Sequence, residues 1–258
     1  MTPAAPPISV VGDDRLADRL ADGGWRVEPE PSAGGVAVVA GAVGERAAAA
    51  GRAAAAGAHP FVLWPPGVSA ADADALAGRA EEAGVEVGVA RPDPARCAAG
   101  LDGWTARLVR LALPAPPEIA LGAGGAVAGA LDLALALVGR SAVARLDAAA
   151  ERDGSHVAAL AASLRFRSGA FAQVWIGGTA PPALYASRPG SHVEASTLDR
   201  PLAVDGQAAP PGVDAGDPLV AEIAAFADAA RAGRRPAYGL DAALGTLRLV
   251  ERVQGHLR

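Results

Sequence analysis

The first third of the chain alternates between short apolar runs and segments of helical composition, and no other feature constrains the fold as strongly. The apolar runs, typical of buried strands, lie at 8–11, 35–40, 61–64 and 85–89. The helical segments lie between them at 14–21, 45–56 and 70–83. Ser69 is a suitable N-cap for the third helix, and Gly84 is a suitable C-terminal stop. Strands that alternate with helices at this spacing predict parallel βαβ units.

Beyond this region the pattern changes to alternating polar and apolar positions, which favours antiparallel strands. Extended runs are predicted at 105–113, 142–149, 158–166, 170–176, 184–187 and 192–195, with a hairpin turn at 167–169. Helices are predicted at 131–138, 218–232 and 240–256, and a loop at 205–216. We therefore predict an α/β domain over residues 1–95 and an open, mostly antiparallel α+β domain over 96–258, whose terminal helices (218–258) can pack back on the first domain.

The charged residues exclude several kinds of chemistry. All 23 basic residues are arginine because the sequence contains no lysine, so Schiff-base, P-loop and lysine acid–base mechanisms are excluded. The net charge of −5, without a basic stripe, argues against nucleic acid as a partner. Cys97 is the single cysteine, and the four histidines show no ligand spacing, so we expect neither a disulfide nor a metal site.

The apolar runs are too short for a membrane span, and residues 1–7 lack the charge and apolar core of a signal peptide. We therefore expect a soluble, cytoplasmic protein with no membrane partner. The dominance of alanine and glycine is typical of a high-GC bacterial genome.

Several segments share the order of elements of one enzyme family. They lie at 69–76, 80–84, 124–125, 131–133, 138–139, 165–170, 217–226, 230–234 and 240–244. The last three correspond to an acidic, phenylalanine-bearing helix, a tight glycine turn and a terminal helix. In this order the segments resemble the Gfo/Idh/MocA family of oxidoreductases over nearly the whole chain. The resemblance implies a Rossmann-type domain that binds NAD or NADP, and hydride transfer to or from a sugar or polyol lying against the second sheet.

The phosphate-binding loop departs from the pattern of this family. The second glycine of the dinucleotide fingerprint is replaced by Asp14, and Asp13 adds a second carboxylate beside it, which disfavours a pyrophosphate. Helix capping is the alternative role for either aspartate. If a dinucleotide binds at all, Gly12, Arg15 and Glu28 are the candidate contacts, with Glu28 placed as a ribose-binding acid.

After Glu28 the chain passes almost directly to the next strand, so the resemblance implies a shortened Rossmann-like domain that lacks one helix and one strand. The fold class is therefore predicted as a shortened parallel sheet followed by an open, mostly antiparallel sheet with helices on one face.

The catalytic positions of the family also differ. Its Glu-Lys-Pro triplet corresponds here to 64–66, which reads Trp-Pro-Pro. Its aspartate and histidine on the central helix correspond to Gly125 and Gly129, glycines that suggest close backbone packing or a ligand against them. Asp132 keeps its register, as a catalytic acid or equally as a capping or salt-bridge residue.

These losses predict a catalytically degenerate protein that acts as a binding, scaffold or regulatory partner, with no tightly bound cofactor. The first alternative is a pocket rebuilt for a non-redox isomerase, lyase or cyclase reaction, with a small-molecule ligand lined by Trp64, Arg91, Asp132 and His156. Each of these residues has a structural alternative: core for Trp64, a surface salt bridge for Arg91, helix capping or a salt bridge for Asp132, and a loop for His156. The second alternative is an atypical NAD(P)-dependent oxidoreductase.

The second sheet is the predicted interface. The resemblance implies a homo-oligomer through strands around 158–176, or a hetero-complex with an active homologue. Phe171 and Trp175 share one face of an alternating strand and are predicted to lie in that interface, with the domain core as the alternative.

Overall fold

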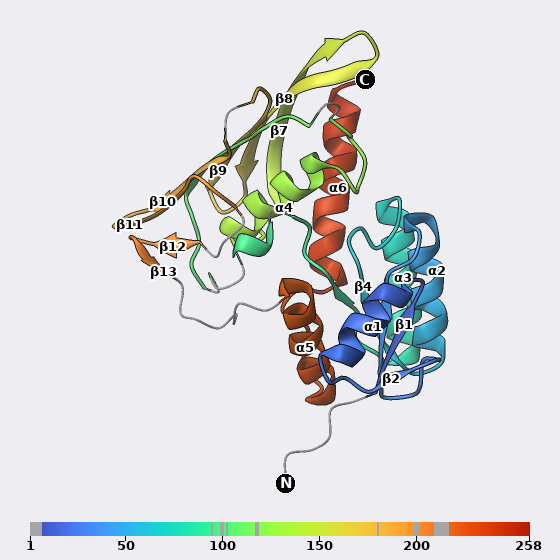
Figure 1. Ribbon diagram of the computed structural model, residues 1–258. Helices are drawn as coiled ribbons and strands as arrows, with labels where there is room; N and C mark the ends of the chain where they lie inside the picture. The colour runs from blue at the N-terminus through green and yellow to red at the C-terminus, as the bar shows by residue number, and fades with distance from the viewer. Residues whose placement is uncertain are drawn as a thin grey trace. The chain divides into compact units, whose positions relative to one another are not determined.

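The computed structural model describes residues 7–93, 95–98, 101, 103–116, 119–179, 181–198, 202–208 and 217–258 (Figure 1). The chain divides into two compact units, the first formed by 1–91 with 215–244 and the second by 92–214 with 245–258. Helix α5 (Pro218–Arg231) belongs to the first unit, and helix α6 (Leu240–His256) begins in the first and continues in the second. In the described ranges, no helix is long and apolar enough to cross a membrane.

The first unit contains a parallel sheet of five strands in the order β2-β1-β3-β4-β5. The strands are β1 (Ile8–Val11), β2 (Val27–Glu28), β3 (Val36–Val39), β4 (His59–Val62) and β5 (Gly88–Val89). The six-stranded dinucleotide sheet has one more strand outside the position of β2. The prediction of a shortened, Rossmann-like parallel sheet is therefore confirmed.

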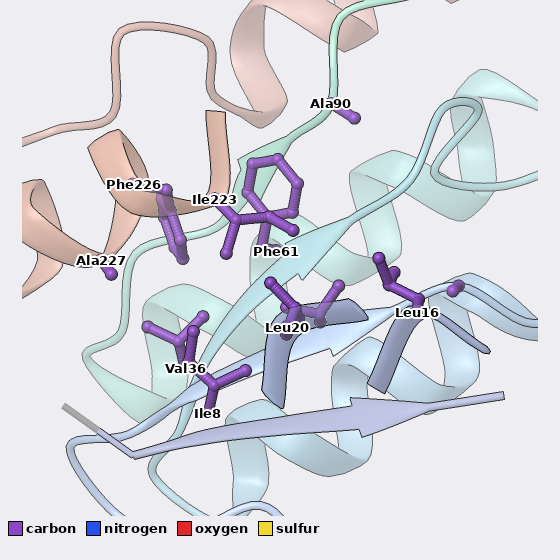
Figure 2. Packing of buried hydrophobic residues seen from close by; sticks show 11 residues of the cluster. Ile8, Leu16, Leu20, Val36, Phe61, Ala90, Ile223, Phe226 and Ala227 are labelled. Carbon is purple, nitrogen blue, oxygen red and sulfur yellow. The ribbon is translucent and has the colours of Figure 1, made fainter. Parts of the chain in front are cut away.

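Helices cover both faces of this sheet. Helix α1 (Asp14–Asp22) and helix α5 contribute apolar side chains to a cluster with β1, β3 and β4 (Figure 2). Helix α2 (Val43–Ala55) packs on the opposite side of β3 through alanines and lies beside α3 (Ala70–Ala83). The rings of Phe61 and Phe226 lie 5.5 Å apart, and a side chain at Gly88 would overlap the Phe226 ring. A glycine is therefore required at Gly88 for α5 to contact the sheet this closely.

Local signals define α3 as predicted. The Ser69 hydroxyl accepts a hydrogen bond from the Asp72 backbone amide, and the Asp72 carboxylate accepts from the Ser69 amide, which forms a capping box. Gly84 ends the helix in the left-handed conformation, with φ of 67°. The expected helix start and stop are both confirmed.

The second unit contains an eight-stranded sheet in the order β13-β12-β11-β10-β6-β9-β8-β7, in which only the β6–β9 pair is parallel. The strands are β6 (Leu108–Leu113), β7 (Val143–Asp153), β8 (His156–Phe166), β9 (Phe171–Ile176), β10 (Ala183–Arg188), β11 (Ser191–Ala195), β12 (Ala203–Val204) and β13 (Gln207–Ala208). The prediction of an open, mostly antiparallel sheet is confirmed.

Some boundaries differ from the sequence-based prediction. Helix α4 (Ala126–Leu137) begins five residues before the predicted 131. The residues from Val127 to Ala130 are buried, so packing stabilises helix in a stretch whose glycine disfavours it locally. Strand β13 falls in the stretch predicted as loop, since a tight turn at Asp205 pairs it with β12. A short 3-10 helix, η1 (Ala95–Ala98), was not predicted. Residues 209–216 of the predicted loop lie outside the described residues.

One face of the second sheet is covered by α4, and the other carries exposed side chains. In β9 the residues Ala172, Val174 and Ile176 are buried, whereas Trp175 points to the other face and is 46% exposed. Tyr185 in β10 is 40% exposed. The alternative that Trp175 belongs to the domain core is therefore wrong.

Asp205 joins the β12–β13 turn to β11. Its carboxylate accepts hydrogen bonds from the Ser191 hydroxyl at 2.8 Å and from the His192 backbone amide at 2.7 Å, and lies 3.1 Å from the His192 Nδ1. The hydrogen bond from the His192 backbone, followed by that from Ser191, lowers the pKa of Asp205 below its ordinary value.

We predict that Asp205→Asn destabilises the protein at neutral pH and that the difference from wild type shrinks in acid. The folded-state pKa lies below the unfolded value of about 4, so the contribution of the carboxylate is complete above that pH and is lost as the pH falls through the folded value. Thermal unfolding of both proteins from pH 7 to pH 3 measures this. A difference that stays constant over the range would contradict the assignment.

Candidate functional site

The candidate site is the carboxyl edge of the parallel sheet in the first unit. Open α/β sheets bind ligands outside the carboxyl ends of their strands, where the strand order reverses. Here the order reverses between β1 and β3. The loops after β1, β3, β4 and β5 lie at this edge, and they carry three of the seven residues proposed from the sequence: Gly12, Trp64 and Arg91. Two more, Arg15 in the first turn of α1 and Glu28 at the end of β2, lie next to this edge.

The loop after β1 approaches the loop after β3 closely. Gly12 has a φ of 88°, and a Cβ there would lie 2.6 Å from the Cα of Gly41. The Val11 carbonyl also accepts from the amides of Ala40 and Gly41. Glycine at position 12 is therefore required by backbone contact between the two loops, independently of any ligand.

The N-terminus of α1 is capped by its own chain. Asp13 is the N-cap residue, and its Oδ1 accepts from the Leu16 amide at 3.0 Å; Asp14 is the first helical residue. In dinucleotide-binding domains the corresponding helix N-terminus holds the pyrophosphate. The capping role is confirmed for Asp13, whose negative charge lies where an anion would bind.

The other two proposed cofactor contacts lie at the same edge. Arg15 is exposed on the first turn of α1. Glu28 ends β2, as expected for a ribose-binding acid, but accepts from the Ser32 hydroxyl at 3.0 Å and pairs with Arg26 at 2.9 Å. Their contact with a dinucleotide stays a prediction.

Arg46, which sequence reasoning missed, makes the most extensive polar contacts at this edge. It lies in the first turn of α2, and its guanidinium donates to five backbone carbonyl oxygens that end β3 and β4. The acceptors are Gly41 at 2.8 Å from Nε, Ala40 at 3.1 Å from Nη2, and Leu63, Trp64 and Pro65 at 3.3, 2.7 and 3.3 Å from Nη1. We call these five oxygens the carbonyl cradle.

The position of Arg46 has a physical explanation. A cation in the first turn of a helix is disfavoured by about 0.3–1 kcal/mol through the helix dipole, and burial lowers the pKa of the Arg46 guanidinium. Hydrogen bonds from a charged donor contribute roughly 1.5–3 kcal/mol each before solvent screening, so the cradle outweighs these costs. The signal available in the sequence was an arginine where the helix dipole favours an acid.

Trp64 and Arg91, the proposed pocket residues of the first unit, both follow sheet strands. Trp64 is half-buried, is joined to Pro65 by a cis peptide bond, and has its carbonyl in the cradle. The Arg91 backbone amide donates to Glu222 at 3.0 Å, and its guanidinium lies 5.8 Å from the centre of the Tyr238 ring. The contact described for this guanidinium is thus aromatic, and a role in a pocket stays a prediction.

Asp132 and His156 belong to the second unit. Asp132 is fully buried in α4, with its two carboxylate oxygens 2.9 and 3.2 Å from the Arg140 guanidinium and its Oδ1 2.5 Å from the Thr246 hydroxyl. The salt-bridge alternative for Asp132 is confirmed. His156 is exposed beside the β7–β8 turn, opposite Asp153, and the hairpin tip lies away from α4 (Figure 1). Asp132 and His156 therefore belong to different elements of the second unit, the α4 helix and the β7–β8 hairpin.

The central-helix glycines are consistent with close backbone packing at one position. A Cβ on Gly125, the N-cap of α4, would lie 2.0 Å from the Ala120 carbonyl oxygen, whereas one on Gly122 would meet nothing within 4 Å. Close backbone packing therefore explains the glycine at position 125 without a ligand.

The chemistry available at the carboxyl edge is limited. The segments 12–15, 40–46, 63–68 and 90–91 contain no histidine, cysteine, tyrosine or lysine. Among the described residues, no three His, Cys, Asp or Glu side chains group as metal ligands. The ionisable side chains of these segments are therefore carboxylates and arginines.

Comparisons with known proteins agree with this fold. No protein-family model matches the sequence, and no curated protein matches it. Among solved structures, the UDP-N-acetylglucosamine 3-dehydrogenase GnnA from Acidithiobacillus ferrooxidans aligns over 97% of both chains with a TM-score of 0.75 and 17% identity. An oxidoreductase from Agrobacterium radiobacter in complex with NAD+, L-tartaric acid and magnesium covers 98% of this chain and 96% of its own, with a TM-score of 0.74 and 15% identity.

The chain has the fold of the Gfo/Idh/MocA oxidoreductases. A third neighbour, the aldose-aldose oxidoreductase from Caulobacter crescentus complexed with glycerol, covers 98% of this chain and 89% of its own, with a TM-score of 0.68 and 19% identity. The resemblance seen in the sequence is confirmed for the fold. Sequence identities of 15–19% support a shared fold only, so these comparisons do not test the catalytic motifs.

We predict that Asp13→Ala lowers the free energy of unfolding by about 1 kcal/mol, because the Leu16 amide loses its acceptor. Asp13→Ser keeps a capping oxygen and should recover most of the loss. Asp14→Ala is the matched control, since Asp14 is not the N-cap residue. Urea unfolding of the three variants measures these differences, and equal losses for Asp13→Ala and Asp14→Ala would contradict the capping assignment.

Proposed function

We propose that this protein is a catalytically degenerate member of its fold group, which acts in the cytoplasm as a binding, scaffold or regulatory partner and does not transfer hydride. The observation that carries the proposal is the Asp13 cap. The carboxylate accepts from the helix amide and adds negative charge where the pyrophosphate of NAD would lie. Asp14, directly after it, adds a second carboxylate beside the same position.

The segment after β4 supports the same conclusion. The family lysine is replaced in the Trp64-Pro65-Pro66 triplet, and the chain has no other lysine to substitute for it. The carbonyls of Trp64 and Pro65 accept from Arg46. Tryptophan and proline side chains have no titratable group, so this segment lacks the proton donor that the family mechanism uses.

We expect titration with NADH and NADPH to give no saturable change in cofactor fluorescence and no rise in melting temperature up to millimolar concentration. Ligand binding to the folded state would raise stability in proportion to ln(1 + [L]/Kd). In the same assay, the Asp13→Ala/Asp14→Gly double variant should bind more tightly than wild type, because both carboxylates are removed. Micromolar binding by the wild-type protein would overturn the proposal.

A second candidate is an atypical NAD(P)-dependent oxidoreductase acting on a sugar- or polyol-like substrate. It is favoured by the fold neighbours, which include a UDP-N-acetylglucosamine 3-dehydrogenase and an oxidoreductase in complex with NAD+. Glu28 at the end of β2 is also compatible with a ribose contact. Cofactor binding together with hydride transfer from a sugar nucleotide would establish this candidate in place of the first.

The proposed partner is a second copy of this chain, bound through the open face of the second sheet. The row across this face joins Glu194, Tyr185, Arg110, Gln173 and Ser163 in register. Exposed aromatic side chains and a central arginine are the composition of interface cores.

The size of the face also suits a dimer. The six strands from β11 to β7 are 5 to 11 residues long. At about 4.8 Å between strands and about 3.3 Å per residue they give roughly 700 Å². A standard interface buries about 800 Å² per partner. A hetero-complex with an active homologue would use the same face.

We predict that the wild-type protein is a dimer in size-exclusion chromatography with light scattering and that Trp175→Glu makes it monomeric, because the charge would be buried at the interface. Val68→Glu is the matched control, since Val68 is 63% exposed and belongs to the first unit, not to the sheet of the second. A monomeric wild-type protein would contradict the homodimer and favour a different partner.

A further inference from the structure

We propose that the carbonyl cradle is a cation site with a preference for guanidinium, which Arg46 fills from within the chain and through which it positions Trp64. The inference does not depend on the proposed function, because it requires neither a cofactor nor a protein partner. It concerns the carboxyl ends of β3 and β4, where a ligand would otherwise meet the sheet.

The cradle is built from two segments that are distant in sequence. Ala40 and Gly41 follow β3, whereas Leu63, Trp64 and Pro65 follow β4. All five acceptors are uncharged carbonyl oxygens, so the positive charge is stabilised by converging backbone dipoles and not by a carboxylate.

The geometry matches a guanidinium better than an ammonium. The three nitrogens of Arg46 divide the acceptors, with Nε and Nη2 on the β3 segment and Nη1 on the β4 segment. A planar group with five N–H donors spans both segments at once. A lysine-type ammonium, with three donors on one atom, cannot reach both sets of oxygens in this way.

These contacts also limit what the Arg46 side chain can bind at the carboxyl edge. An arginine at the carboxyl edge of a parallel sheet suggests an anion clamp, but the donors of Arg46 are directed into the protein backbone. Arg46 therefore does not serve as a phosphate ligand. It ties the end of β3 to the turn that carries Trp64, so the location of this indole depends on Arg46.

The test is chemical rescue of Arg46→Ala. The variant is labelled with 5-fluorotryptophan, and the resonance of Trp64 is assigned with Trp64→Phe. We expect Arg46→Ala to lower the melting temperature and shift the Trp64 resonance. Ethylguanidinium chloride at millimolar concentration should reverse both changes, whereas ethylammonium chloride at the same concentration should reverse neither. The resonances of Trp104 and Trp175, in the second unit, should stay unchanged.

Controls separate the cradle from general effects. Arg52→Ala removes another arginine of the same helix, in its last turn, and should show no rescue. Arg46→Lys should shift the Trp64 resonance as Arg46→Ala does. Lysine keeps the positive charge but loses the planar guanidinium that reaches both segments of the cradle. If Arg46→Ala does not fold, the wild-type protein still tests the inference: the Nε–H of Arg46 should exchange with solvent more slowly than that of the exposed Arg15.

Three outcomes would overturn the inference. They are equal rescue by ethylammonium, an unshifted Trp64 resonance in a folded Arg46→Ala variant, and fast exchange of the Arg46 Nε–H. Binding of NADH by the wild-type protein would overturn the proposed function and leave this inference standing, so the two are tested separately.

Discussion

The end of a parallel sheet leaves backbone polar groups without strand partners, and burying such groups unpaired costs free energy. In this protein the groups are satisfied from within the chain. The Arg46 guanidinium donates hydrogen bonds to the carbonyls that follow β3 and β4, and the Asp13 carboxylate accepts one from an amide at the start of α1. Dinucleotide-binding folds keep part of the same edge for a ligand. The first unit therefore has a parallel sheet of this type with several polar groups at its carboxyl edge hydrogen-bonded within the chain.

The second unit is organised by a different constraint. Its long sheet has one face packed against α4 and one face with exposed aromatic and charged side chains. On the covered side, the buried Asp132 carboxylate is matched by Arg140 and Thr246, as a buried charge requires. The ion pair with Arg140 thus gives Asp132, which keeps the register of the family motif, a structural role.

Elements with strong local signals were predictable from sequence. The Ser69 cap and the Gly84 stop of α3, and the alternation of β8 and β9, depend on neighbouring residues and are predicted correctly. The start of α4 and the strands β12 and β13 were missed, because they depend on packing and on pairing between segments. In the candidate site, Asp13 was found because a cap is local, whereas Arg46 contacts oxygens up to 19 positions away.

The sequence by itself determined the order of strands and helices, the resemblance to an oxidoreductase fold and the absence of lysine at every position where the family mechanism needs one. These follow from periodicity and composition, which are properties of the chain before it folds. Only the tertiary structure decided which polar groups meet: Arg46 with the cradle, Asp132 with Arg140, and Gly12 with Gly41. The reason is that such contacts require two distant segments to lie within hydrogen-bonding or van der Waals distance, which local sequence pattern does not specify.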